Sequence, residues 1–482
     1  MKRLRILAST RRTRDQEQGS AIVLVVIVGV MMLAAGSVII GRTGTESKLA
    51  DRQSEYEGAL HAAEAGVHDY IAKLTEDRIY FRHRVHPAED TRNRVSPLSG
   101  SYAPDTVWPG DQTWTYPAAK TQYRQLLGTT ASQYEYNLRI TPSTGGPVTI
   151  TATGRRRTNP RLTRTIEVVV KGSSIADYQA IYDKDINYGA TAVTSGRIYS
   201  TGNISYLGTA SADILAEKAI TGPATNIIAP ARRCDQNGTY NACKIRSVLT
   251  NPISFDSFTA SFDEIKRVAQ SSALGGMYRD QPTKAGWRLT FLNNGQVKIE
   301  VCTSAVSLAS GAAAPAGCVV DSQPNVPALG VLYFEQPVIV LGQVKGRVTV
   351  SSSADIIIGG PIDYVDPTVD VLGLLAKVNV IVAEYVPATF SWKGAVLAQT
   401  GMIQYYGPAN TGPCTGLDKN GTMTFTGSWA SKGGGCMATS DLQHGFDTRI
   451  YNYDPNLSNL QPPFLPVLEE AYKILRYRET DS

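Results

Sequence analysis

Six cysteines are the residues of this 482-residue chain whose spacing most clearly indicates chemistry. They fall into three neighbouring pairs: Cys234 with Cys243, Cys302 with Cys318, and Cys414 with Cys436. No C-x-x-C motif occurs and the five histidines do not flank the cysteines, so a metal site is disfavoured. Six cysteines allow fifteen pairings, of which three local disulfides are the simplest in an exported chain. We predict those disulfides and no metal.

Carboxylates are the next candidates, because glycan-active enzymes work with clustered acidic groups. Five aspartates lie among strands and turns: Asp183, Asp185, Asp355, Asp363 and Asp366. Their spacing forces no dyad, and no G-x-S-x-G, H-E-x-x-H or P-loop motif is present. We therefore predict no enzyme, no catalytic residue and no cofactor.

Two further polar motifs have a structural and a ligand-binding interpretation. The run from Asp183 to Gly189 resembles the start of a calcium loop, but its glycine is one place late and Thr194 replaces the final glutamate. Arg155–Arg157 fits an exposed strand end better than a site for an anionic polymer. The net charge is +5, and residues 1–19 hold six basic against two acidic residues. The rest carries no strong field for nucleic acid, which we exclude as a partner.

An uncharged apolar run over residues 20–41 follows that basic start. At about 1.5 Å per residue it spans roughly 33 Å, enough to cross a bilayer. The basic residues before it predict a cytoplasmic N-terminus and an extracytoplasmic body. The sequence thus predicts a transmembrane helix and a single-pass membrane protein.

The helix is expected to continue beyond the apolar run. Residues 42–77 contain no proline, and charged residues fall mostly off one apolar stripe. The stripe consists of Leu49, Tyr56, Leu60, Ala63, Val67, Ile71 and Leu74. A single helix over residues 20–77 would be a rod roughly 87 Å long.

The start of the chain resembles a known family. A basic leader ending in Gly19, then Ser20 and an apolar helix, resembles the type III signal of type IV pilins and pseudopilins. The stretch Ala50–Leu74, with its A-A-E-A-G segment, resembles the PilX-type minor pilin N-terminal domain, so the resemblance covers about residues 15–75. It implies cleavage after Gly19 by the prepilin peptidase, methylation of the new N-terminus, other pilin or pseudopilin subunits as partners, contact with membrane lipid, and a place at the cell surface or in a pilus.

One position departs from that family. Most pilins carry a glutamate five residues after the cut, thought to meet the N-terminal amine of a neighbouring subunit, and here the position is Leu24. The departure favours a minor, priming or tip subunit of a type IV pilus or related secretion filament. Three alternatives stay open: an anchor that is never cut, a stand-alone surface adhesin binding glycans through residues such as Tyr405, Tyr406, Tyr451 and Tyr453, and an anchored glycan-active enzyme.

Residues 84–482 are predicted to form β-structure in two parts. The pattern of residues 84–172 predicts a packed loop region and a pilin-like antiparallel head. Its strands are expected at 134–140, 148–152 and 163–171. Ile181, Ile198 and Leu215 then recur at a fixed interval, which favours a β-solenoid over 173–482, with an open β-sandwich as the alternative. Val467–Arg476 is expected to close the last coil. The predicted fold class is α+β, mainly β, with a leader at 1–19, a transmembrane helix at 20–41, an amphipathic helix at 42–83, the head at 84–172, and a β-solenoid-like domain bearing disulfide loops at 173–482.

Overall fold

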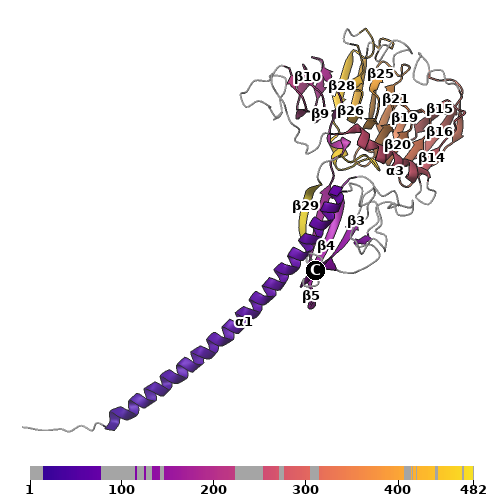
Figure 1. Cartoon of the computed structure of the whole chain (residues 1–482). Coiled ribbons are helices and arrows are strands. Elements are labelled where there is room, and N and C mark those ends of the chain that lie inside the picture. The colour runs from indigo at the N-terminus through magenta and orange to yellow at the C-terminus, as the bar shows by residue number, and fades with distance from the viewer. Residues whose placement is uncertain are drawn as a thin grey trace, which may run out of the picture.

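The computed structural model describes one long helix followed by β-structure. The described residues are 15–76, 114–116, 124–125, 133–141, 146–190, 192–222, 253–270, 276–303, 314–405, 414, 416–419, 421–439, 443–468 and 472–480. Helix α1, Asp15–Glu76, has 62 residues and contains no proline. Figure 1 shows its first part standing clear of the remaining described elements and its end lying on a small sheet.

The membrane predictions require correction. Across the described residues, no helix combines the length and the apolarity needed to cross a bilayer. The transmembrane helix at 20–41 and the single-pass membrane localisation are therefore wrong on this finding.

The head is an antiparallel sheet in the order β1-β3-β4-β5-β29, with β2 also pairing β3. Its strands are β1 (Trp114–Tyr116), β2 (Arg124–Gln125), β3 (Tyr134–Thr141), β4 (Val148–Arg156), β5 (Asn159–Lys171) and β29 (Lys473–Thr480). Burial alternates along β4, where Val148, Ile150 and Ala152 are fully buried and the threonines between them are half-buried. Alternation of this kind packs one face of a sheet on a core, and here α1 supplies the other side of that core.

The body holds the other three described sheets. A 12-stranded sheet contains β6 (Ala180–Tyr182), β8 (Val193–Thr194), β9 (Ile198–Ser200), β11 (Thr209–Ala210), β12 (Ile214–Ala216), β14 (Met277–Arg279), β18 (Val331–Phe334), β20 (Arg347–Ser352), β22 (Val371–Ala376), β24 (Phe390–Ala398), β26 (Thr422–Ser431) and β28 (Thr448–Asn452). An 8-stranded sheet contains β15 (Gly286–Phe291), β16 (Val297–Cys302), β17 (Cys318–Ser322), β19 (Val338–Val344), β21 (Ile356–Tyr364), β23 (Val380–Val382), β25 (Ile403–Tyr405) and β27 (Gly435–Cys436). A 3-stranded sheet contains β7 (Ile186–Tyr188), β10 (Ile204–Tyr206) and β13 (Ile220–Thr221). Helix α3, Thr259–Gln270, lies against β18 and β14 (Figure 1).

The predicted fold class also needs correction in the body. The structure is mainly β, but its strands are divided among several sheets instead of forming one regular stack of coils. Two features interrupt the expected period. Strand β16 pairs antiparallel with β15 on one side and with β17 on the other, and the later strand β26 pairs with the earlier strand β6. The interval near 180–215 corresponds to the parallel pairing of β6, β9 and β12, and parallel pairs recur from β18 to β28 and from β19 to β27. The antiparallel unit and the pairing of β26 with β6 break the single regular period that the sequence predicted.

The C-terminal segment has a different role from the predicted one. Val467–Arg476 does not close the last coil, because β29 returns to the head and pairs antiparallel with β5, with Tyr477 opposite Val168. Strand β5 has 13 residues, and β4 covers one edge only. Strand β29 supplies backbone partners for the other edge, which would otherwise be an open template for pairing.

Candidate functional site

The first part of α1 exposes a continuous apolar surface. Every large hydrophobic side chain between residues 23 and 33 is exposed: Val23, Leu24, Val25, Val26, Ile27, Val28, Val30, Met31, Met32 and Leu33. The exposed fraction is 65% for Leu24 and 76% for Leu33. Isolated exposed apolar side chains are ordinary, but a large contiguous patch marks an interaction surface. We call residues 23–33 the apolar segment.

The predicted processing positions lie at the start of this segment. Gly19 and Ser20 are within α1, and the helix continues without a break through Leu24. Leu24 is directed to solvent in the isolated chain. Cleavage and methylation at Gly19 and Ser20 stay predictions.

The second part of α1 is fastened to the head by small residues. Ala59, Ala62 and Ala63 are fully buried, and a β-carbon placed on Gly154 of β4 would lie 2.0 Å from the carbonyl oxygen of Ala59. Such a separation is far below contact distance, so only glycine allows the helix to lie this close to the strand. On the helix side, a β-carbon on Gly66 would lie 2.5 Å from the Tyr136 ring. The A-A-E-A-G segment is thus a close-packing surface.

Only some residues of the predicted apolar stripe are buried against the head. Ala63, Val67 and Leu74 are buried, whereas Leu49 and Tyr56 are exposed. The sequence analysis missed Tyr70, which is fully buried in the head core, and Gly154, for which no local signal existed. Spacing of small residues along Ala59–Gly66 was the signal that could have located the contact face.

Polar contacts fix the rotation of α1 on the head. Arg156 forms an ion pair with Glu55, and the Asn159 side-chain amide donates to Glu55 Oε2 at 3.0 Å. Hydrogen bonds from Asn159 and Arg156 hold the pKa of the Glu55 carboxyl below its usual value. Further along the helix, Tyr136 Oη donates to Asp69 Oδ2 at 2.9 Å.

The C-terminal strand adds one more link to the helix. Tyr477 Oη of β29 donates to Glu64 Oε1 at 3.0 Å. Helix, first strands and last strand therefore form one unit. The arginine cluster takes part in it, since Arg155 pairs with Glu135 at 2.8 Å in addition to the Arg156 contact.

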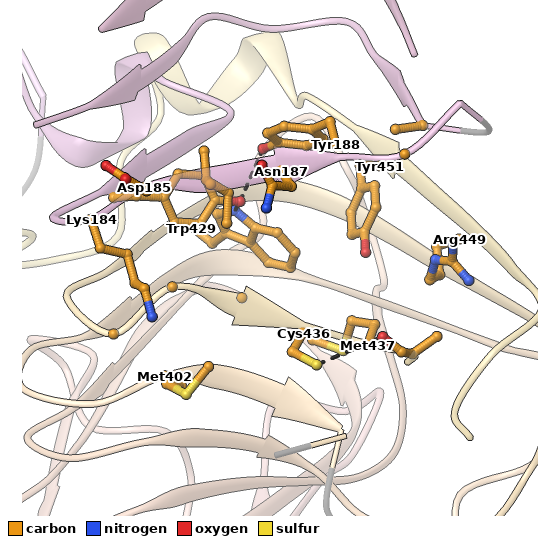
Figure 2. Close-up of a pocket in the computed structure, with 18 of the residues that line it drawn as sticks. Lys184, Asp185, Asn187, Tyr188, Met402, Trp429, Cys436, Met437, Arg449 and Tyr451 are labelled. Carbon is orange, nitrogen blue, oxygen red and sulfur yellow. Dashed lines mark hydrogen bonds between the residues drawn. The ribbon is translucent and has the colours of Figure 1, made fainter. Parts of the chain in front are cut away.

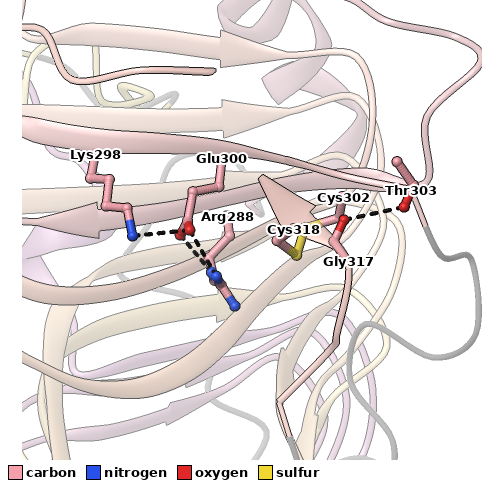
Figure 3. The surroundings of a disulfide bond; sticks show 7 residues. All are labelled: Arg288, Lys298, Glu300, Cys302, Thr303, Gly317 and Cys318. Carbon is pink, nitrogen blue, oxygen red and sulfur yellow. Dashed lines mark hydrogen bonds and ion pairs between the residues drawn. A yellow bond between two sulfur atoms is a disulfide. The ribbon is translucent and has the colours of Figure 1, made fainter. Parts of the chain in front are cut away.

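Two disulfides occur within the described residues, both between sequence neighbours. Cys302 and Cys318 join β16 to β17, and Cys414 is bonded to Cys436. Figure 3 shows the first beside an ion-pair group in which Glu300 accepts from Arg288 Nε at 2.7 Å and lies 3.0 Å from Lys298 Nζ. Cys234 and Cys243 lie outside the described residues.

The candidate carboxylates are separate and occupied by neighbouring turns. Asp185 accepts from the Asn203 backbone N–H at 2.7 Å, and Asp355 accepts from the Asn379 backbone N–H at 2.9 Å. The others have their own partners: Thr201 for Asp183, Lys393 for Asp363 and Thr368 for Asp366. Within the described ranges no three His, Cys, Asp or Glu residues are grouped to hold a metal ion. Asp183, Asp185 and Asp355 thus link neighbouring turns, whereas the contact of Asp366 lies within one turn.

The tyrosines of the adhesin alternative are largely engaged in packing. Tyr405 is fully buried and Tyr451 is half-buried. Tyr453 Oη donates to the Ala176 carbonyl oxygen at 2.9 Å. Tyr406 lies outside the described residues. The described members thus offer no exposed aromatic platform for a sugar.

Comparisons with known proteins give one distant structural neighbour to report. No family model matches the chain, and no curated protein matches it. The crystal structure of the competence-associated pilin ComZ from Thermus thermophilus aligns over 88% of this chain and 97% of its own, with 12% identity and a TM-score of 0.30. The neighbour is a pilin, while the narrower PilX-type resemblance gains no support.

Proposed function

We propose that this chain is a non-catalytic structural subunit, of the minor-pilin kind, in a type IV pilus-related filament. The main support for this proposal is that α1 has two different parts. Residues 23–33 expose an apolar surface, and the second part packs against the head. A rigidly mounted helix with an uncovered apolar surface suits assembly with other helices of the same kind.

Energetics support partner helices as the cover of the apolar segment. Burying one large aliphatic side chain contributes about 1.5–3 kcal/mol, so the ten exposed side chains supply ample drive for association. The contacts between α1 and the head make the helix and the head one unit, so that association of the helix also positions the head. The proposed partners are other pilin or pseudopilin subunits.

The finer proposal concerns processing and position. We take Gly19 as the cleavage point for a prepilin peptidase, with Ser20 as the mature N-terminus. Leu24 offers no carboxylate to a neighbouring N-terminal amine, and burying an unpaired charge is costly. A tip or priming position, where fewer neighbours surround the helix, fits this residue. Mass determination of the native N-terminus tests the cleavage, and a chain beginning at Met1 would contradict it.

The decisive experiment compares matched valine substitutions in the full chain. Val26→Asp with Val30→Asp places two charges in the apolar segment, where the exposed fractions are 57% and 59%. Val193→Asp changes a body valine that is 57% exposed. Recovery of the chain with sheared filaments should fall at least tenfold for the first variant and stay unchanged for the second. Equal recovery of both variants would reject the proposal.

A further inference from the structure

A pocket lies where two sheets of the body end. Its volume is about 530 Å³, and residues of β7 line one side while Gly433–Cys436 line the other. Tyr182 and Trp429 are at its inner side, joined by a 2.8 Å hydrogen bond from Trp429 Nε1 to Tyr182 Oη. Figure 2 shows these strands with Trp429 and Tyr451 between them.

The two bordering strands are both edges in the described part of the body. Strand β7 ends the 3-stranded sheet and β27 ends the 8-stranded sheet. The neighbouring layer is continuous at the same level, because β26 pairs with β6 and places Trp429 opposite Ala180. The 12-stranded sheet is therefore continuous at the level where β7 and β27 are both unpaired edges of the described sheets.

Backbone groups of both edge strands, β7 and β27, point into the pocket. The Ile186 N–H donates to Asn203 and the Tyr188 carbonyl accepts from Leu207, so both residues of β7 are directed to β10. In a parallel ladder alternate residues point to opposite sides, and the N–H and C=O of Asn187 therefore face the pocket. The same alternation applies to Gly435, since its neighbour Gly434 accepts from Ile403.

The glycine wall and the basic residues of the pocket indicate what kind of ligand it could bind. Gly433, Gly434 and Gly435 give one wall no side chains of its own, and the methylenes of Lys184 lie against Gly434. Lys184 and Arg449 stand at opposite ends of the pocket (Figure 2), and among described residues neither forms an ion pair. The lining carboxylate Asp185 is held by Asn203 at 2.7 and 3.0 Å.

We propose that this gap accepts an extended acidic peptide segment of a partner protein as an added strand between β7 and β27. Edge strands pair readily with an incoming strand, whose main chain supplies affinity and whose side chains supply specificity. Carboxylates at the two ends of the segment would meet Lys184 and Arg449. This inference does not depend on the filament proposal.

The test uses the full chain on an array of immobilised ten-residue peptides of random sequence, with immobilised oligogalacturonate as the acidic glycan probe. Asn187→Pro removes the pocket-facing N–H without removing a β7–β10 hydrogen bond, and Asn187→Thr keeps that N–H as the matched control. Acidic peptides should be retained by the wild type and Asn187→Thr and at least tenfold less by Asn187→Pro. Lys184→Gln with Arg449→Gln should lose the preference for acidic peptides.

Hydrogen exchange supplies a readout that does not rely on a variant folding. A retained peptide should slow amide exchange at Asn187 and Gly435 of the wild-type chain. Three results would each overturn the inference: equal retention by Asn187→Pro and Asn187→Thr, preference for oligogalacturonate over every peptide, or slowed exchange confined to other sites.

Discussion

Gly154 lies directly against Ala59, so closely that a β-carbon on the glycine would be 2.0 Å from the alanine carbonyl oxygen. The contact joins a strand of the head to the second part of a helix that begins 44 residues before Ala59, at Asp15. The strand cannot yield without disturbing its pairing with β3 and β5. The distance from helix to sheet is therefore set by the lack of one side chain.

Gly154→Val should detach the helix from the head. The new side chain would collide with helix backbone, and overpacking of this kind costs about 1–3 kcal/mol, occasionally more. Hydrogen exchange of β4 and β5 amides should show the corresponding loss in opening free energy. Gly189→Ala is the matched control, because a β-carbon there meets nothing within 4 Å. Equal exchange in the two variants would show that the contact is dispensable.

The Glu55 contacts should make helix docking sensitive to acid. The pKa of Glu55 is lowered in the folded chain by Asn159 and Arg156, so its stabilising contribution is complete above the ordinary value of 4.5 and is lost as pH falls through the depressed folded pKa. Wild type should exceed Glu55→Gln in thermal stability at neutral pH and match it in strong acid. Glu57→Gln, on an exposed helix residue, is the control. A difference that persists unchanged in acid contradicts this assignment.

Removal of residues 473–482 should open the head, although they follow the whole body in sequence. Strand β29 covers the outer edge of β5 and links to the helix through Tyr477 and Glu64. Without it, limited proteolysis should cut within residues 159–171 at lower protease concentration. Tyr477→Phe keeps the strand and removes only the hydrogen bond, with an expected cost of about 1 kcal/mol. Unchanged cleavage of the truncated chain would mean that β29 is a passive edge.

Loss of the Cys302–Cys318 disulfide should destabilise the body. The bond closes a loop with a sequence separation of 16, and a loop of that size contributes about 3 kcal/mol in the chain-entropy treatment. Replacement of both cysteines by serine should lower the free energy of unfolding by about 2–4 kcal/mol in denaturant titration. Adding reductant to the double-serine variant measures how much the Cys414–Cys436 disulfide contributes, and so separates it from the Cys302–Cys318 effect. A variant as stable as the wild type would disprove a stabilising role.

Leu24→Glu should alter position within the proposed filament. The new carboxylate could pair with a neighbouring N-terminal amine, which removes the cost of burying that charge alone. Immunogold counts along filaments should then rise in the shaft relative to the ends. Leu24→Gln has similar size without the charge and should leave the distribution unaltered. Identical labelling in both variants would remove the basis for an end position.

Local features of the sequence were enough to predict several elements. The lack of proline over residues 42–77 predicted a helix that α1 covers to Glu76, and alternation of apolar residues predicted strands at β3, β4 and β5. Both signals depend on neighbours within a few positions, which set the period of a helix or strand. The close spacing of Cys302 and Cys318 similarly favoured a local disulfide.

Other features were decided only by the tertiary structure. Thr480 donates to the Thr165 carbonyl across a separation of 315 residues, and β26 pairs with β6 across 249 positions, from Trp429 back to Ala180. No local period encodes such partners, because any strand edge offers the same backbone groups. The chain alone thus determined a helix with an apolar start and a set of strands. Packing determined which glycine meets the helix, which strand completes the head and where a sheet is left open.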